Sequence, residues 1–163
     1  MAINKISEEL LRSTMANFAT GVTIITAKDH DHNRLCGFTA NSFCSLSLQP
    51  ALVSFSLHKE SPTIPAIMNS NKFAINILSK SQEELARHFA KYNNDKLAGL
   101  EYELGDFSQA PLIKGAICHI ECDVWQVYAG GDHEICIGQV EDNKVNNEDE
   151  QFMYFRRNYC ELK

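Results

Sequence analysis

The chain has 163 residues, of which 44% are hydrophobic, and its formal net charge is -6. This length is sufficient for a single domain, residues 1–163, whose hydrophobic core needs no disulfides. The negative charge argues against nucleic acid or an anionic membrane as the main partner. The first residues lack the apolar core of a secretory signal, and no segment has the roughly 18 apolar residues of a membrane span. We therefore expect a cytoplasmic protein.

The predicted elements of the first half of the chain are mostly strands. They are a helix at 7–19 that Gly21 ends, strands at 22–27, 35–39 and 51–57, a charged hairpin turn at 28–34, and a short helix that starts near Ser61. β-Branched and apolar residues indicate the strands, and the prolines after Ser61 are tolerated in a first helical turn. Between the second and third strands lies the Ser-rich segment discussed below.

The second half is predicted to contain more hairpins. It has strands at 72–78, 116–128, 134–141 and 152–155, a helix opened by a capping box at Ser81–Glu84, an irregular excursion at 91–109, and an acidic loop at 145–150. Gly130, Gly131 and Asp132 predict a tight turn between the two longest strands. Six or seven strands with two or three helices predict a mainly β fold, an antiparallel barrel with peripheral helices.

Six cysteines occur without a C-x-x-C pair, so we expect reduced, buried thiols. Cys118, His119 and Cys122 are close together, but on a strand His119 points away from the face that the two cysteines share. This geometry is poor for one zinc ion, and we predict no metal site.

Several common catalytic motifs are absent. The chain has no P-loop, no G-x-G-x-x-G after a strand and no G-x-S-x-G nucleophile motif. Most carboxylates lie in polar runs that are typical of solvated surfaces. We therefore predict no acid–base catalytic residue.

The segment from Phe38 to Pro50 alternates hydroxyl and amide side chains with apolar ones, and no charge lies between Arg34 and His58. Such a surface suits a flat, polar-edged ligand that carries phosphate, because small side chains let the ligand approach the main-chain N–H groups. The alternative is a Ser-rich turn whose side chains bond their own backbone. Composition alone does not separate the two.

Two further features stand out. Gly130–His133 places a histidine at the start of a long strand, where it has either a structural or a binding role. Tyr154–Tyr159 combines aromatic and basic residues near the C-terminus, and it is either a ligand-binding cluster or a terminal strand with a solvated tail.

In this order along the chain, these motifs resemble the short-chain flavin reductases of the flavin-reductase-like, FMN-binding split-barrel family. The matching blocks are 18–26, 37–43, 45–50, 61–66, 73–78, 85–90, 110–113, 131–133 and 154–156. The resemblance covers nearly the whole chain. It implies an antiparallel split β-barrel and a homodimer with flavin near the subunit interface.

The resemblance also implies site residues. The flavin would contact Phe38, Thr39, Ala40, Asn41, Ser42, Cys44, Ser45, Ser47, Ser54, Ser56, Lys59, Ser61, Thr63 and Arg87. The nicotinamide would contact His133, Tyr154, Phe155, Arg156 and Arg157. Lys59 would be the main cation near the phosphate. Cys44 and Gln49 depart from the family pattern, and Phe38 stands where a smaller residue is common.

The implied activity is reduction of FMN or FAD by NADH or NADPH, with no catalytic side chain, because hydride passes directly to the flavin. Reduced flavin would serve a transient monooxygenase partner that acts on an aromatic compound, or be released free. The alternatives are a flavin- or haem-binding protein without turnover and a reductase for another acceptor such as a corrinoid. The flavin, the reductant and the tightness of flavin binding stay open.

Overall fold

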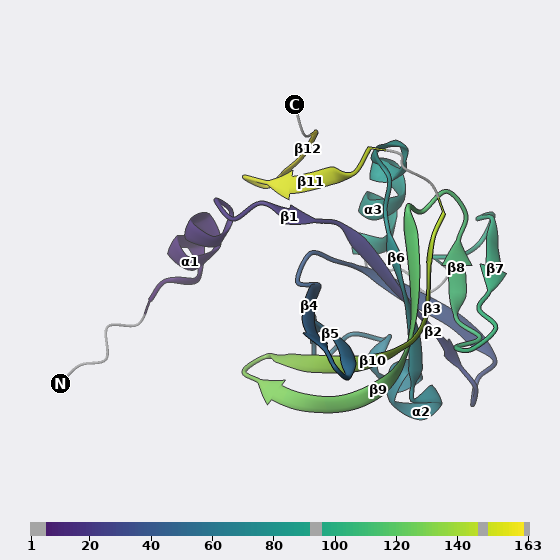
Figure 1. Cartoon of the computed structure of the whole chain (residues 1–163). Coiled ribbons are helices and arrows are strands. Elements are labelled where there is room, and N and C mark those ends of the chain that lie inside the picture. Colours follow the sequence, from purple (N-terminus) through teal and green to yellow (C-terminus); the bar gives the residue numbers. More distant parts are fainter. Residues whose placement is uncertain (1–5, 92–95, 147–149, 162–163) are drawn as a thin grey trace.

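The computed structural model describes residues 6–91, 96–146 and 150–161 (Figure 1). The helices are α1 (Glu8–Met15), α2 (Ile64–Ser70) and α3 (Glu83–Ala90), with a 3-10 helix, η1, at Lys80–Gln82. The strands are β1 (Thr20–Gly21), β2 (Thr23–Asp29), β3 (Arg34–Ala40), β4 (Cys44–Leu48), β5 (Ala51–His58), β6 (Lys72–Ile77), β7 (Tyr102–Leu104), β8 (Pro111–Ile113), β9 (Cys118–Gly130), β10 (His133–Val145), β11 (Phe152–Phe155) and β12 (Asn158–Glu161). The prediction of a mainly β fold with a few helices is confirmed.

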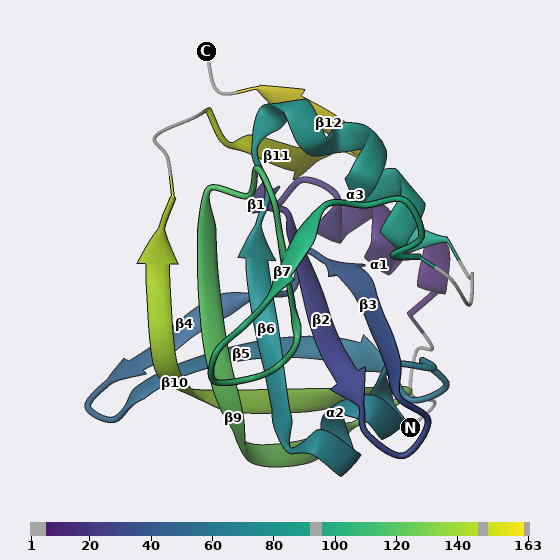
Figure 2. The ribbon, with the colours of Figure 1, turned by 90° about the vertical axis from the view of Figure 1, so that its right-hand side faces the viewer.

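One large antiparallel sheet dominates the fold. Its strand order is β3-β2-β6-β9-β10-β5-β4, so β3 and β4 are its two edges. Figure 2 shows that β9 runs beside β6 and β10 beside β9, and that both strands then bend toward β5. A register shift between Ile137 and Gly138 accompanies this bend, as expected of a β-bulge. Gly138 suits the position because a Cβ atom there would collide with the ring of Phe73.

The hairpin of β9 and β10 ends in a two-residue loop, Gly131 and Asp132. Gly131 has a φ of 68°, which glycine adopts without strain and which short hairpin loops favour at their first position. The loop places His133 opposite His58, the last residue of β5. The predicted turn is therefore confirmed.

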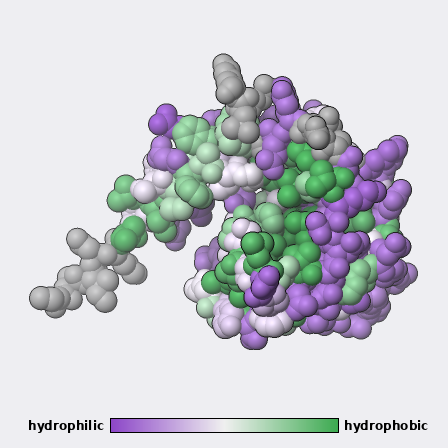
Figure 3. All heavy atoms as spheres, viewed as in Figure 1, coloured by the Kyte–Doolittle hydropathy of each residue, from purple (hydrophilic) through white to green (hydrophobic). Residues whose placement is uncertain are grey.

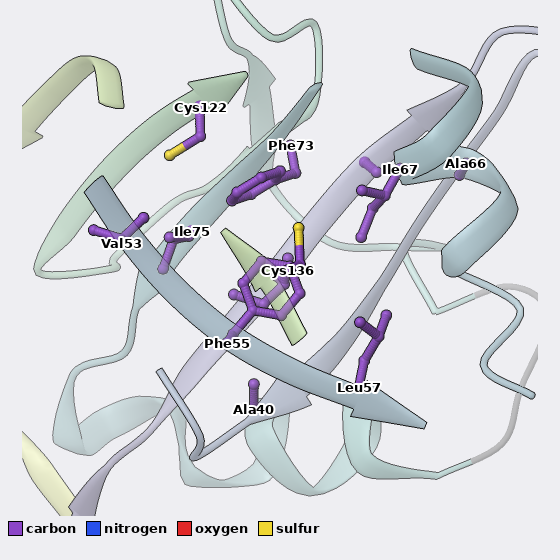
Figure 4. Close-up of a cluster of buried hydrophobic side chains, with 12 residues drawn as sticks. Ala40, Val53, Phe55, Leu57, Ala66, Ile67, Phe73, Ile75, Cys122 and Cys136 are labelled. Carbon is purple, nitrogen blue, oxygen red and sulfur yellow. The ribbon is translucent and has the colours of Figure 1, made fainter. Parts of the chain in front are cut away.

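The main core fills the inside of the curved sheet. Phe55 and Phe73 pack edge to face, with ring centroids 5.1 Å apart, and Ala66 and Ile67 of α2 cover one side (Figure 4). A second core cluster lies under α3, around Phe89. Burial of these apolar side chains is the main force that holds the helices against the sheet.

A small sheet, β1-β11-β12, stands beside the main one and leads to α1. Figure 1 shows α1 apart from the body, and none of its residues is buried. The turn of β11 and β12 anchors it, because the N–H of Arg156 donates to the carbonyl of Ala16 at 2.8 Å. Arg156 and Arg157 both adopt positive φ, 48° and 64°, which is uncommon outside glycine.

Several boundaries differ from the sequence predictions. The first helix ends at Met15 and not at Ala19, and the capping box is formed by Ser79 and Gln82, since Ser81 lies inside η1. Strands β1, β4, β7, β8 and β12 were not predicted. Parts of the predicted excursion and acidic loop, 92–95 and 147–149, lie outside the described residues.

The cysteines are only partly as predicted. All six are free thiols, and Cys122 and Cys136 lie in the main core, where burial raises the pKa of the Cys136 thiol to about 12. Cys44, however, is exposed on β4. Within 6–91, 96–146 and 150–161, no group of three or more metal-ligating side chains is found. No helix among these residues is long and apolar enough to cross a membrane.

Candidate functional site

The hydroxyl-rich segment leaves the sheet at the end of β3 and is held from both sides. Thr39 donates from Oγ1 to the carbonyl of Ala86 in α3 at 2.6 Å, and Thr23 donates from Oγ1 to the carbonyl of Ala40 at 2.9 Å. Because β3 is an edge strand, its outer main-chain groups have no ladder partner in the described sheet and are available to a ligand.

Ser42 connects this segment to β5. Its Oγ accepts a hydrogen bond from the N–H of Ser56 at 2.9 Å and donates to the carbonyl of Ser56 at 3.0 Å. One hydroxyl thereby replaces the pair of ladder bonds that a neighbouring strand would supply. As a result, the segment after β3 is fixed to the main chain of β5 at Ser56, and the two together form a wall.

A groove of about 740 Å³ lies along this wall, within the range typical of small-molecule sites. It is lined by Phe38, Thr39, Ala40, Asn41, Ser42, Ser56, Leu57, His58, Glu60, Ser61, Pro62, Phe89, Ala90, Lys91, Lys96 and His133. The structure thus brings together eight residues that the sequence singled out: Phe38, Thr39, Ala40, Asn41, Ser42, Ser56, Ser61 and His133.

The cations at the groove are not the predicted one. Lys91 and Lys96 line it, whereas Lys59 is exposed and outside the lining. Lys96 donates from Nζ to the carbonyls of Phe89 and Gly37, at 2.8 and 3.2 Å, and burial lowers its pKa. Lys96 therefore ties the end of α3 to β3 and places an ammonium group at the groove.

A second cavity of about 920 Å³ lies between α1 and the sheet. It shares Asn41 and His133 with the groove and is also lined by Tyr154 and Arg157. Arg157 forms an ion pair with Glu9 of α1, Nη2 to Oε1 at 2.7 Å. Three of the predicted nicotinamide-side residues, His133, Tyr154 and Arg157, are therefore found around one cavity.

The remaining predicted residues lie outside both cavities. Cys44 and Ser54 face each other on β4 and β5, with Sγ and Oγ 3.2 Å apart, and Ser45 and Ser47 follow on β4. Thr63 is buried at the start of α2. These positions separate them from the groove lining.

Two arginines also lie apart from the groove. Arg87 pairs with Glu83 at 2.7 Å, and its guanidinium lies 4.7 Å from the ring centre of Tyr159. Arg156 lies over the ring of its neighbour, Phe155, and donates to Asn17.

Sequence reasoning missed His58, Glu60, Lys91 and Lys96. Strand alternation predicts the first of these, because Ser54, Ser56 and His58 share one face of β5. No local pattern marks Lys91 or Lys96. A further cavity of about 940 Å³, between the hairpin of β7 and β8 and the ends of β9 and β10, contains none of the predicted residues.

The fold and groove define a class: an antiparallel β protein with peripheral helices and a largely uncharged, hydroxyl-rich ligand groove at a sheet edge. The model of the flavin reductase like domain matches residues 15–163. A flavin reductase of Pseudomonas putida is 36% identical over 154 residues, which cover 94% of this chain and 89% of the relative. The chain therefore belongs to the flavin reductase like family.

Two other relatives agree with this assignment. The reductase component of 4-hydroxyphenylacetate 3-monooxygenase from Thermus thermophilus is 32% identical over 155 residues, covering 95% of this chain and 97% of that protein. The structure of the NADH:FAD oxidoreductase of Streptomyces globisporus, in complex with NAD and FAD fragments, superposes with a TM-score of 0.91 at 34% identity, covering 96% and 93% of the two chains. The protein is thus an oxidoreductase, a flavin reductase.

Proposed function

We propose that this enzyme reduces FMN or FAD with NADH or NADPH and supplies reduced flavin to a partner monooxygenase that acts on an aromatic compound. The observation that carries the proposal is the groove, because it joins the uncharged segment Phe38–Ser42 to His133. The partner is proposed from relatives such as the Thermus reductase component. We further propose that the chain is one cytoplasmic catalytic domain.

The groove fits a flavin in the chemistry of its donors. The amide of Asn41 and the free main-chain groups at 39–42 suit the polar edge of an isoalloxazine, since the hydroxyls of Thr39 and Ser42 donate to the carbonyls of Ala86 and Ser56. The ammonium groups of Lys91 and Lys96 suit a phosphate. Lys96 thereby takes the place that the sequence assigned to Lys59. Glu60 is the carboxylate in the lining, and it would favour a phosphate position nearer the two lysines.

A bound flavin supplies the hydride-accepting chemistry. The residues of the chain bind and orient the reactants. Ser42 and Thr39 hold the wall of the groove in place through their bonds to Ser56 and Ala86, so little rearrangement is needed on binding. Main-chain donors at this wall would stabilise negative charge that develops on reduction. His133 stands where the groove meets the second cavity and would orient the nicotinamide there.

We also propose that the large sheet is a split barrel and that two copies form a homodimer. The edge strand β3 packs across the interior against β5, with the rings of Phe38 and Phe55 5.9 Å apart.

Figure 3 shows apolar residues gathered on α1 and on the body beside it. Leu48 is 90% exposed, and Trp125 and Tyr128 are more than half exposed. Such apolar surface is typical of an interface, and light scattering on the purified protein should give twice the chain mass.

The test of the function is NADH or NADPH oxidation by the purified protein with added FMN or FAD. We expect turnover that rises with flavin concentration and saturates. A yellow protein that does not oxidise either reductant would contradict the reductase and support a binding protein without turnover.

Replacing Ser42 by alanine should weaken flavin binding about tenfold. The change leaves the N–H and carbonyl of Ser56 without their partner, and the wall of the groove loses its attachment to β5. Titration of flavin fluorescence measures the dissociation constant. Ser13→Ala, an exposed hydroxyl on α1, is the matched control and should bind flavin like the wild type. Equal affinity in Ser42→Ala and the control would contradict this role.

A further inference from the structure

His58 and His133 form a cross-strand pair at the end of the β5–β10 ladder. They are register partners, and their rings meet edge to face with centroids 5.3 Å apart. The N–H of Lys59 donates to the carbonyl of Asp132 at 3.0 Å and closes the ladder beyond them. The backbone therefore fixes the separation of the two rings.

Each ring is also oriented through its Nδ1 atom. The N–H of Glu60 donates to Nδ1 of His58 at 3.2 Å, so the neutral ring carries its proton on Nε2. His133 donates from Nδ1 to the carboxylate of Asp132 at 2.8 Å, and this bond holds the pKa of Asp132 below its ordinary value. In both rings Nε2 is left for other contacts.

The bond to Asp132 alone is a weak restraint on His133. Asp132 is its direct neighbour in the chain, the pair is solvent-exposed, and the His133 side chain is 44% exposed. Exposed ion pairs contribute little to holding a geometry. The ring of His58, which lines the same groove, is the aromatic contact that restricts rotation of the His133 imidazole.

We propose that His58 is a positioning residue: its ring packs against His133 and holds that imidazole at the angle at which it receives the nicotinamide of the reductant. The inference rests on the proposed function and extends it to a groove residue outside the segment 39–42 and Ser56. The contribution of His58 is the face and edge of its ring, and its hydrogen-bonding nitrogens are not required.

Three variants distinguish the contribution of the His58 ring from that of its hydrogen-bonding nitrogens: His58→Ala, His58→Gln and His58→Phe. We expect the KM for NADH to rise about 3- to 10-fold in the alanine and glutamine variants, with kcat and the flavin dissociation constant nearly unchanged. His58→Phe keeps the edge-to-face contact and should restore the wild-type KM. His30→Ala, in the exposed turn between β2 and β3, is the matched control.

A second readout needs no flavin and no turnover. In carbon–proton spectra of the flavin-free protein, the Cε1–H signal of His133, assigned with His133→Ala, should shift in His58→Ala and His58→Gln because the ring current of His58 is lost. In His58→Phe the signal should stay displaced by the new ring. Unfolded variants would be recognised in the same spectra.

The proposal would be overturned, with the reductase function left intact, by either of two results. One is a wild-type KM for NADH in His58→Ala. The other is a wild-type KM in His58→Gln together with a raised KM in His58→Phe. Absence of NADH and NADPH oxidation in the wild type would overturn the function, and the nicotinamide role of His58 with it. The spectra would then still report whether the two rings pack.

Discussion

His133→Ala is expected to lower kcat/KM for the reduced nicotinamide about 10- to 100-fold while flavin binding stays nearly intact. The histidine stands at the junction of the groove and the second cavity, whereas the segment 39–42 and Ser56 form the wall of the groove without it. Stopped-flow measurement of flavin reduction at several NADH concentrations, beside a flavin titration, measures the two functions separately.

The flavin titration is the internal control of that experiment. Equal losses of nicotinamide use and of flavin affinity would identify His133 as a structural residue of the hairpin. Asp132→Ala offers a comparison, since it removes the hydrogen bond to Nδ1 of His133 and retains the imidazole. We expect Asp132→Ala to have the smaller effect, because His58 still packs against the ring.

Asn76→Leu is expected to lower the free energy of unfolding by about 2–4 kcal/mol. Asn76 is fully buried on β6, and its Oδ1 accepts from the N–H of Ile113 at 2.7 Å. Its Nδ2 donates to the carbonyl of Ile24 and to Oγ1 of Thr26, at 3.1 and 3.2 Å. Leucine has a similar volume but takes the Asn76 partner away from the buried N–H of Ile113 and carbonyl of Ile24, whereas the hydroxyl of Thr26 keeps its bond to the carbonyl of Pro111 at 2.6 Å.

Urea denaturation of both proteins, with an unchanged slope, measures this loss. Asn69→Leu is the matched control, because the amide of Asn69 bonds Asp31 at the surface and should contribute less than about 0.5 kcal/mol. A loss of the same size in both variants would show that the buried network of Asn76 adds nothing specific.

The sequence predicted much of the fold where local patterns are strong. The strand at 152–155 was predicted with its observed bounds, and the strand at 72–78 differs by one residue. Both have the alternation or the apolar runs of ordinary strands. By contrast, β4 was missed because its serines and Cys44 are mostly exposed, so the strand depends on pairing with β5.

The residues of the candidate site likewise divide into those that a local sequence pattern predicted and those that it did not. Thr39, Asn41 and Ser42 were found because an uncharged hydroxyl-rich segment is visible in the sequence. Lys96 was not, because it reaches the groove through bonds to Gly37 and Phe89, residues 59 and 7 positions away. Lys59 was chosen for its place in a motif, but strand geometry places the neighbouring His58 in the groove lining instead.

The sequence by itself determined the mainly β class, the family resemblance and the segment that forms one wall of the groove, since these depend on residue type and order along the chain. Only the tertiary structure decided which cations stand at the groove, that His58 faces His133, and that α1 and Arg157 line the second cavity. These features join residues that are far apart in sequence. Their positions follow from sheet register and the bend of β9 and β10, which no local pattern records.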